Sequence, residues 1–517
     1  MMETNRCVFH VFLCISLILT HWETSSACQP GSHDECEKAP FVPGYNLAGE
    51  GFDIVEMRRK GAFLINVKSH MDNGTCTICK NRFQGGQMQK LPSAVLDWRP
   101  FSRCSKQLSS ALHHSVDSLM KSSTSLINKW ELDLSLDEVG KAILGGSRSD
   151  MAKFAQSQNA MDKSTFALHE FSCTYYSYRV TDHPELSSEF SKHLRKLPTQ
   201  YDVKSKPLYR RTIDTYGTHY IRQVHLGGRV RRLTAFQICI ATLMGFSETD
   251  IKNCLNIELK IKLGFLSANA LFPNKCSQIL KDNMGMGFYQ SFMTQKTEVL
   301  GGEKYFPDVV LNQSPAEAYE NWKTSLHNNP EVISYTISPL YHLVAHPEVS
   351  ANLKNAIREY IEENMLSIND KENQRCSQTP NLDHSCCPMR AGRGKLKVFV
   401  DRATGMNEDY FSATDGFVKI WYNGIYKETE VVINNNDPVW NTWIGFGSIE
   451  FGHELIFEVW DSDVNFNDFV GRCVVRPERG NHSDSCPLQR GIFYFRYSAF
   501  CDAHLTGPRC SQYSPQT

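Results

Sequence analysis

The sequence predicts a large α+β domain, a short connector and an all-β sandwich. Its 517 residues are 41% hydrophobic and 21% charged, which is enough for several folded domains and too apolar for a disordered chain. Helical and strand-like patterns alternate from Cys28 to about Leu366, whereas short strand-like runs separated by turn residues dominate after residue 391. Between them the composition shifts towards Asn, Asp, Cys, Pro and Gly, which indicates a connector.

The net charge excludes one class of function. Lys and Arg number 55 and Asp and Glu 56, so the formal net charge is -1. A general nucleic-acid binder would carry a basic excess, and we therefore expect no nucleic-acid partner.

The first 27 residues have the pattern of a secretory signal peptide. Arg6 precedes the apolar run Val8 to Leu19, and the small residues Ser25, Ser26 and Ala27 suit a cleavage site. Twelve residues are too few to cross about 30 Å of hydrocarbon as a helix, so a membrane anchor is the weaker interpretation. We expect a secreted protein.

The cysteines and glycosylation sequons agree with secretion. Removing Cys7 and Cys14 with the signal peptide leaves sixteen of eighteen cysteines, an even number that predicts a disulfide framework. The CTIC sequence at Cys76 and Cys79 could also be a redox motif, but secretion favours structural bridges. Sequons begin at Asn73, Asn312 and Asn481.

Hydrophobic spacing predicts the elements of the first domain. Apolar residues at helical spacing indicate helices around residues 108–119, 136–143 and 353–365. Residues 257–265 alternate strictly between apolar residues and Glu, Lys or Gly, which predicts a half-buried strand.

The second domain shows five strand-like runs between turn signals. They are KLKVFV, GFVKIWY, TEVVI, ELIFEVW and GIFYFRY, and their spacing is typical of a sandwich.

Acidic residues cluster in the loops of this predicted sandwich. Asp409 and Asp415 follow one strand, Asp461, Asp463 and Asp468 follow another, and Asn434 lies in a third loop. Calcium takes six to eight oxygen ligands, so carboxylates that converge from separate loops predict a calcium site. The alternative is that turn-forming Asp residues merely occupy solvated loops.

Aromatic residues lie in the same acidic loops. Tyr410, Phe411 and Phe466 would enter the lipid interface if exposed, or pack against the loop bases if buried. Residues 392–517 carry sixteen acidic and twelve basic residues, so bound calcium would reverse a local charge that repels anionic lipid.

These motifs closely resemble a C2 domain, the calcium-dependent phospholipid-binding module. The resemblance rests on GKLKVFVDRATGM, TDGFVKIWY, NNNDPVW and ELIFEVWDSDVNFNDFVG, and it implies that the five aspartates are calcium ligands. Asn467 stands where the family often has an acid, and the stretch from Asp463 to Asp468 is one residue short.

The large domain resembles the membrane-attack-complex/perforin family. Six residues separate Tyr209 from the sequence YGTHYI. In this sequence Tyr216, Gly217, Thr218, His219 and Tyr220 match the family signature. Taken alone, His219 is better interpreted as a structural histidine than as a catalyst. LGG sequences follow that contain Gly227, Gly228, Gly301 and Gly302, which are either strand hinges or simple turns.

The resemblance implies a bent antiparallel sheet with flanking helical clusters, each of which refolds into an amphipathic β-hairpin. The candidate segments are Asp133 to Ser172 and Ser267 to Val299. Such hairpins are stable in lipid only when neighbouring subunits close a barrel, so a ring-shaped homo-oligomer is required.

The domain boundaries follow from these assignments. We expect a pore-forming domain at residues 28–370, a cysteine-containing connector at 371–391 and a C2 domain at 392–517. The connector is too short for the EGF-like module of similar proteins and is interpreted as a reduced remnant.

The predicted function is calcium-dependent perforation of target-cell membranes by a secreted cytolytic protein. The resemblance implies release from cytolytic granules and passage of granule proteases through the pore. The chain shows no G-x-S-x-G, HExxH or Walker sequence, so we expect no enzyme. The alternatives are a calcium-dependent adhesion protein that never perforates and a secreted lipid hydrolase.

Overall fold

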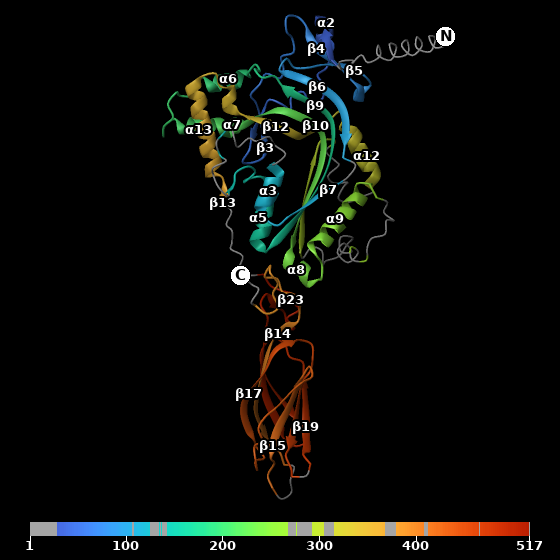
Figure 1. Cartoon of the computed structure of the whole chain (residues 1–517), viewed down its shortest axis with the longest axis vertical. Helices are drawn as coiled ribbons and strands as arrows, with labels where there is room; N and C mark the ends of the chain where they lie inside the picture. Colours follow the sequence, from blue (N-terminus) through green and yellow to red (C-terminus); the bar gives the residue numbers. More distant parts are fainter. Residues whose placement is uncertain are drawn as a thin grey trace, which may run out of the picture.

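The computed structural model describes residues 28–105, 108–124, 134, 136, 142–266, 274, 276, 292–303, 315–367, 379–407, 412–464 and 466–515. The predicted signal peptide at residues 1–27 lies outside this part of the chain. A mixed domain forms the upper part of the molecule and a narrow sandwich extends below it (Figure 1).

A large antiparallel sheet organises the first domain. Its strand order is β3-β2-β10-β9-β6, with β11 and β12 also paired to β10 and β7 paired to β9. The strands are β2 (Glu50–Asp53), β3 (Arg58–Phe63), β6 (Val95–Cys104), β7 (Ser109–His113), β9 (Ser164–Val180), β10 (His219–Gln237), β11 (Met293–Leu300) and β12 (Glu331–Pro339). The two longest strands, β9 with 17 residues and β10 with 19, are neighbours in the middle of the sheet.

Two helical clusters cover opposite faces of the lower part of this sheet. Helices α3 (Val116–Thr124) and α5 (Asp150–Met161) pack with Phe166 and Leu168 of β9. Helices α8 (Ile238–Leu243) and α9 (Glu248–Lys262) pack with the intervening residue Ala167. Since successive side chains of a strand point to opposite faces, the clusters enclose the sheet between them (Figure 1).

The predicted strand at residues 257–265 is wrong, because residues 248–262 form the helix α9. Its buried residues Ile251, Cys254, Leu255, Glu258 and Leu259 follow helical spacing. Ser247 begins the helix with a capping box to Asp250. The alternation of residues 257–265 covers little more than two turns, and the longer helical period that precedes it decides the structure.

The other predicted helices have mixed outcomes. Residues 108–119 divide into the strand β7 and the beginning of α3, so one continuous helix there is wrong. Of residues 136–143, the described Ala142–Ile143 form the short strand β8, paired with β13 (Leu366–Ser367). The amphipathic helix at residues 353–365 is confirmed as part of α13 (Pro347–Glu363), which ends two residues before Met365.

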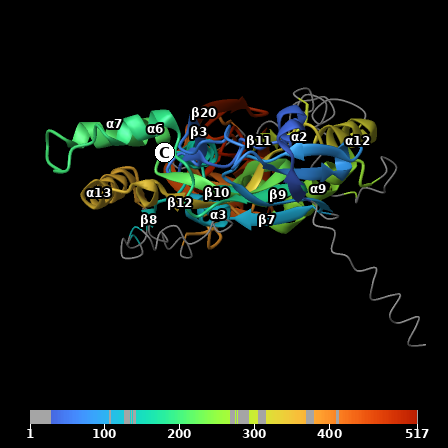
Figure 2. The same ribbon diagram turned by 90° about the horizontal axis from the view of Figure 1, so that it is seen from above.

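Further helices flank the sheet. Helices α6 (Ser188–Leu194), α7 (Lys206–Tyr216) and α13 project on one side, and α12 (Pro315–Ser325) lies on the other (Figure 2). Lys206 forms a 2.8 Å ion pair with Glu359 between α7 and α13. Tyr360 of α13 donates a 2.9 Å hydrogen bond to the buried Asp53 of β2. A 3-10 turn, η4 (Leu340–Leu343), connects β12 to α13.

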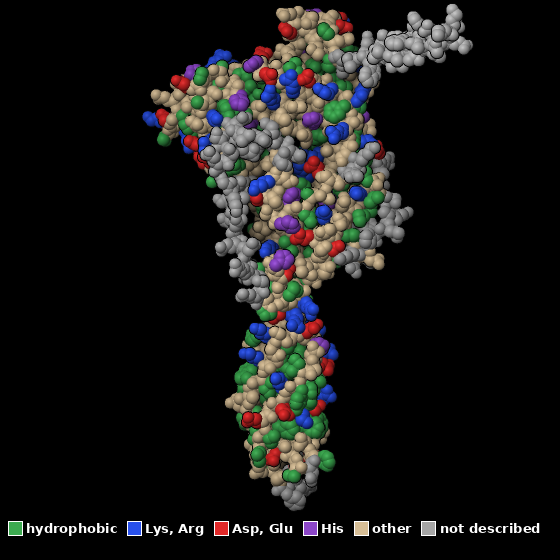
Figure 3. Space-filling model, in the orientation of Figure 1, with side chains coloured by type: hydrophobic (Ala, Val, Ile, Leu, Met, Phe, Trp, Pro, Cys, Tyr) green, Lys and Arg blue, Asp and Glu red, His purple; other side chains and the backbone are tan. Residues whose placement is uncertain are grey.

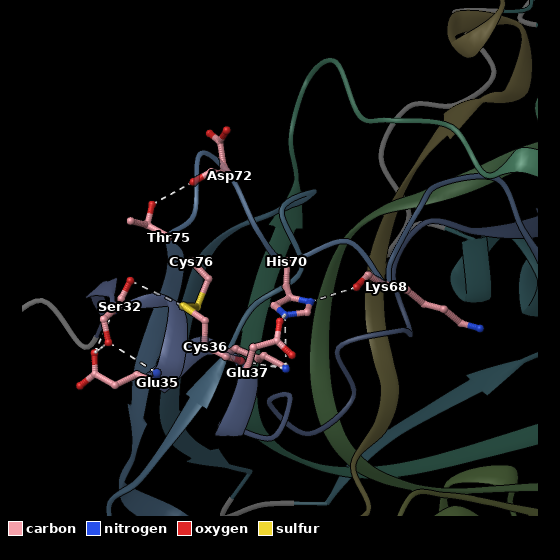
Figure 4. Close-up of a disulfide and its surroundings, with 11 residues drawn as sticks. Ser32, Glu35, Cys36, Glu37, Lys68, His70, Asp72, Thr75 and Cys76 are labelled. Atoms are coloured by element: carbon pink, nitrogen blue, oxygen red, sulfur yellow. Dashed lines mark hydrogen bonds and ion pairs between the residues drawn. A yellow bond between two sulfur atoms is a disulfide. The ribbon is translucent and has the colours of Figure 1, made fainter.

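A small disulfide-linked sheet lies at the upper end of the molecule. Strands β1 (Cys28–Gly31), β4 (Cys76–Asn81) and β5 (Gln87–Lys90) form it, with α2 (His33–Lys38) beside β4 and the 3-10 turn η1 (Arg82–Gln84) before β5. Disulfides join Cys28 to Cys79 and Cys36 to Cys76, the second within a cluster that includes the capped start of α2 (Figure 4). The structural interpretation of the CTIC cysteines is therefore confirmed.

The second domain is the predicted sandwich of two four-stranded antiparallel sheets. The first sheet has the order β17-β14-β21-β20 and the second β16-β15-β18-β19. The strands are β14 (Arg393–Thr404), β15 (Gly416–Tyr422), β16 (Ile425–Glu428), β17 (Val439–Glu450), β18 (Leu455–Asp461), β19 (Asp468–Val475), β20 (Gly480–Pro487) and β21 (Ile492–Cys501). Four predicted runs are confirmed, but TEVVI is wrong because residues 429–433 form no strand beyond one bridge at Val432.

The tail and connector tie the two domains together. After β21, the tail pairs β22 (Leu505–Thr506) with β23 (Gln512–Tyr513). Tyr513 donates a 3.0 Å hydrogen bond to Asp162, just after α5. The disulfide between Cys239 of α8 and Cys387 of the connector adds a covalent link.

The predicted disulfide framework is visible in seven bridges between described residues. Besides those named above, they join Cys104 to Cys173, Cys254 to Cys276, Cys473 to Cys486 and Cys501 to Cys510. Across the described part of the chain, no helix combines the length and apolar character needed to cross a bilayer.

Candidate membrane-docking site and family signature

The strand register brings three of the predicted calcium ligands to the same end of the second sheet. Asp415 immediately precedes β15, Asp461 is the last residue of β18 and Asp468 is the first residue of β19. The strand register pairs Asp461 with Gly416 on one side and with Asp468 on the other. Asp463 and Asn467 lie in the loop between β18 and β19, whereas Asp409 lies outside the described residues.

The buried Asp461 connects two of the acidic loops. Its side chain is 1% exposed, and its Oδ1 accepts a 2.6 Å hydrogen bond from the backbone of Asp415. The carboxylate of Asp415 in turn accepts a 2.5 Å hydrogen bond from the backbone of Asn434. These backbone donors therefore fix the positions of both carboxyl groups.

The third loop is braced by the predicted Asn434 and by Asn436 and Asp437, which the sequence analysis missed. Asn434 has a left-handed φ of 53°, and its amide oxygen accepts from the backbone of Ala413 at 3.2 Å. Asn436 accepts two 3.0 Å hydrogen bonds from Thr414. Asp437 accepts a 2.8 Å hydrogen bond from the backbone of Gly405. The run of Asn and Asp residues at 434–437 was the available signal, since such side chains cap turns.

The donor set suits calcium in its chemistry. The side chains that meet here offer hard carboxylate oxygens from two separate loops, and amide oxygens lie in the third, as this ion requires. Within the described residues, however, no three Asp, Glu, His or Cys side chains lie close enough together to hold a metal.

Exposed apolar side chains surround this acidic end. Phe466 is 86% exposed, so it does not pack against the loop base. Val464 in the same loop and Ile433 in the neighbouring loop are also highly exposed, at 103% and 73%, and the sequence analysis missed both. Tyr410 and Phe411 lie outside the described residues.

The acidic loops lie far from the first domain. Strand β14 begins next to the tail and connector, and its twelve residues lead to the loop end. At about 3.3 Å per residue this strand spans roughly 36 Å. The acidic end is consequently the free lower tip of the molecule, where hydrophobic side chains are also visible at the surface (Figures 1 and 3).

The YGTHY sequence packs and hydrogen-bonds the start of β10 against β2. Gly217 has a φ of +81°, and a Cβ there would lie 2.4 Å from the carbonyl oxygen of Phe52. Thr218 Oγ1 accepts a 3.1 Å hydrogen bond from the backbone of Ile54. Tyr216 and Tyr220 are buried on either side. This packing explains why the sequence has glycine and threonine at these positions.

His219 is fully buried, with its Nδ1 2.8 Å from Thr218 Oγ1. Burial lowers its pKa to about 3. A neutral imidazole enclosed in the core agrees with the structural interpretation of this histidine.

The four glycines of the LGG sequences form one close contact. The register between β10 and β9 shifts between Leu226 and Gly227, and a Cβ on Gly227 would lie 1.9 Å from the oxygen of Cys173. Cβ atoms on Gly228 and Gly302 would each lie 2.4 Å from the ring of Trp322. Trp322 also donates a 2.9 Å hydrogen bond to the oxygen of Gly301. These glycines are thus required by close packing at an irregularity of the sheet.

The remaining predicted sites fall partly within the described residues. Asn73 and Asn481 are exposed, as glycosylation requires, and Asn312 lies outside the described residues. Of the predicted hairpin segment 133–172 the structure describes 134, 136 and 142–172, and of 267–299 it describes 274, 276 and 292–299. Helix α5 lies within the first segment, whereas α3, α8 and α9 lie outside both.

Comparison with known families decides the identity of the large domain. Residues 41–369 match the family described as MAC/Perforin domain, and residues 394–489 match the C2 domain. The chain belongs to the MAC/perforin family. The predicted fold class, a bent-sheet domain of this family followed by a C2 sandwich, is confirmed.

Relatives from this family match along nearly the whole chain. Perforin-1 of Mus musculus is 32% identical over 536 residues, which cover 98% of this chain and 97% of that protein. Perforin-1 of Homo sapiens is 31% identical and covers 95% of this chain and 93% of that protein. Complement component C7 of Mus musculus is 27% identical over 65% of this chain and 39% of that protein.

Proposed function

We propose that this chain is a secreted pore-forming protein that docks on phospholipid membranes through its C2 sandwich before it perforates them. The observation that carries the proposal is one chain in which a MAC/perforin sheet with two helical clusters is joined to a sandwich with an exposed acidic and apolar tip. The proposed domains are a signal peptide at 1–27, the pore-forming domain at 28–370, the connector at 371–391 and the C2 domain at 392–517.

Docking begins at the acidic end. Asp409, Asp415, Asp461, Asp463 and Asp468 would hold calcium, with amide oxygens of Asn434 and Asn467 nearby. When bound there, calcium would supply the positive charge that these acidic loops lack for attraction to anionic lipid phosphates. Phe466, Val464 and Ile433, together with Tyr410 and Phe411, would then enter the lipid interface.

Insertion follows from the helical clusters. Because α5 leads directly into β9, and β10 leads into α8, extension of these strands converts each cluster into a hairpin that continues the sheet. Ten residues of strand cross the hydrocarbon, and unpaired edges are not tolerated there. The hairpins therefore require neighbouring subunits, and the product is a ring-shaped oligomer with a β-barrel. Gly227, Gly228, Gly301 and Gly302 are the proposed hinges.

The same proposal covers the cellular setting. We propose storage in cytolytic granules, insertion into target-cell membranes and passage of granule proteases through the pore, as the resemblance to the MAC/perforin family implies. We infer a non-enzymatic mechanism, supported by the buried structural role of His219.

Dye release from phosphatidylcholine liposomes tests this function. We expect release with calcium, none with chelator, and a loss of at least about tenfold in activity for Asp461→Asn, because this variant removes charge but keeps an acceptor for the backbone of Asp415. The matched control is Asp484→Asn, an exposed acid on β20.

The outcomes separate the competing functions. Calcium-dependent binding without release would contradict perforation and favour the adhesion protein. Release of lysophospholipid or fatty acid would favour the hydrolase instead.

A further inference from the structure

The outer face of the first sandwich sheet is unlike the rest of the C2 domain. On β14, Leu396, Val398 and Val400 point into the core of the sandwich. The alternating residues Lys395 and Lys397 point outwards and are exposed. This outer face belongs to the sheet β17-β14-β21-β20.

Cations and aromatic rings are interleaved on this face. The Arg496 guanidinium lies 4.1 Å from the ring centroid of Phe399, which also contacts Trp443 at 5.0 Å. The Arg402 guanidinium lies 4.5 Å from the ring of Tyr494. Trp443 is 54% exposed, although it is a large aromatic residue. Rings and long basic side chains together are the composition of surfaces that lie at a membrane interface.

The charge of this face opposes the charge of its domain. Residues 392–517 contain sixteen acidic and twelve basic residues. Four of the basic residues, Lys395, Lys397, Arg402 and Arg496, nevertheless point out from this one face. Three acids lie near them. Asp401 is 3.4 Å from Arg402, and the exposed Glu450 pairs in register with Arg393. Burial raises the pKa of the third, Asp502, while Arg393 and Lys395 lower it. The positive charge is thus segregated from the acidic loops.

The face is continuous with the docking tip. Arg402 pairs in register with Val439, and Thr404 pairs with Ile492. Val439 and Ile492 are 57% and 41% exposed, so the apolar rim of the acidic end extends onto this sheet. The row of Lys397 and Ser498 ends at the sequon residue Asn481 of the edge strand β20, which marks a lateral edge of the face.

We propose that this face is a second lipid-contacting surface, which binds the headgroups of anionic phospholipids while the tip is docked. Arg402, Arg496 and Trp443 are its centre. The inference rests on the proposed docking function. This aromatic-rich surface fits a membrane rather than a small soluble anion, because its cations are spread along the outer faces of two neighbouring strands, β14 and β21. The sandwich therefore lies tilted on the bilayer, with this sheet towards the lipid.

Liposome sedimentation tests the proposal with the full-length protein. Vesicles of phosphatidylcholine alone are compared with vesicles containing one-fifth phosphatidylserine, both with saturating calcium. Each cation near an anionic surface contributes about a fivefold gain in affinity. We expect Arg402→Gln with Arg496→Gln to lower the preference for phosphatidylserine by about tenfold or more, and to leave binding to phosphatidylcholine unchanged.

Two further variants control for folding and for net charge. Lys395→Gln with Lys397→Gln removes two exposed cations from the same face without breaking an aromatic contact, and a smaller loss of preference is expected. Lys419→Gln with Arg472→Gln removes the same charge from the outer face of the second sheet, where Glu458 lies between them in register, and should preserve the preference.

Each outcome has a definite meaning. The proposal would be overturned if the parent protein showed no preference for phosphatidylserine. It would also be overturned if Lys419→Gln with Arg472→Gln lost the preference as much as Arg402→Gln with Arg496→Gln. Failure of the parent protein to bind phosphatidylcholine with calcium, while the preference still depends on Arg402 and Arg496, would contradict calcium docking and support the second surface.

Discussion

At the scale of single residues, the conspicuous sequence motifs have different physical origins. Gly217 and Thr218 are required by the close approach of β10 to β2, so the family signature describes a strand junction. Asp415 and Asp461 are acids that accept hydrogen bonds from the backbone of neighbouring loops. The first motif therefore stabilises the fold, and the second belongs to the proposed calcium site.

The buried His219 predicts a specific dependence of stability on pH. Its pKa is about 3 in the folded protein and about 6.5 when unfolded, so the unfolded chain binds an extra proton between these values. Stability should fall by about 1.4 kcal/mol per pH unit below about 6.5 on account of this residue, or about 2 kcal/mol at pH 5.

Denaturant unfolding at pH 7, 6 and 5 measures this effect as a slope. In His219→Asn, the free energy of unfolding should change less steeply with pH than in the parent protein, by the equivalent of one proton, whatever the variant's stability at pH 7. His33→Asn, at an exposed position of α2, should keep the parent slope. Equal slopes in the parent and His219→Asn would show that His219 accepts a proton in the folded state.

At the scale of elements, the sequence predicts the type of a segment best where one period extends over many residues. The apolar residues of α13 maintain helical spacing for several turns, and its prediction is confirmed. The nine residues at 257–265 fit a strand by themselves, yet Ile251, Cys254 and Leu255 continue the same face as a helix. Short apolar runs do not distinguish the two structures.

Edge strands and distant contacts escaped prediction for another reason. Strand β20 is mostly exposed on both faces, so it has no hydrophobic alternation to detect. The exposed Ile433 and Val464 look like core residues in sequence, and only their place at the loop tips separates them from the core. The acidic loops were predictable because charge density is visible without tertiary information.

The capping box at the start of α9 makes a prediction at this scale. Ser247 Oγ accepts from the backbone of Asp250 at 3.1 Å, and the Asp250 carboxylate accepts from the backbone of Ser247. Ser247→Ala should destabilise the helix by about 1 kcal/mol, which hydrogen exchange would detect as about fivefold faster exchange in α9.

A control substitution lies in the same helix. Lys260→Ala removes a side chain near the end of α9 and should leave the exchange of its first turns unchanged. Equal exchange in Ser247→Ala and the parent protein would mean that packing against β9 and β10 alone fixes the start of α9.

At the scale of the whole molecule, few contacts join the two domains. Besides the Cys239–Cys387 disulfide, Tyr513 bonds to Asp162, and Lys163 donates a 2.9 Å hydrogen bond to the oxygen of Ser385. Cys239→Ser with Cys387→Ser should therefore leave both domains folded but allow them to separate.

Small-angle scattering and calorimetry check that expectation together. We expect a larger radius of gyration and two unfolding transitions in the double variant, because the disulfide closes a loop of 148 residues. Removing the Cys501–Cys510 bridge of the tail, which lies within one domain, is the control. An unchanged radius would show that the tail contacts suffice to hold the domains together.

The same disulfide also determines where mechanical force is transmitted. Once the lower tip is anchored on a bilayer, any pull between membrane and sheet passes through the short connector to Cys239, the second residue of α8. The disulfide therefore transmits the force to the start of a helical cluster and not to the core strands of the sheet. Under the proposed function, the helical cluster that receives this force is one that converts into a hairpin.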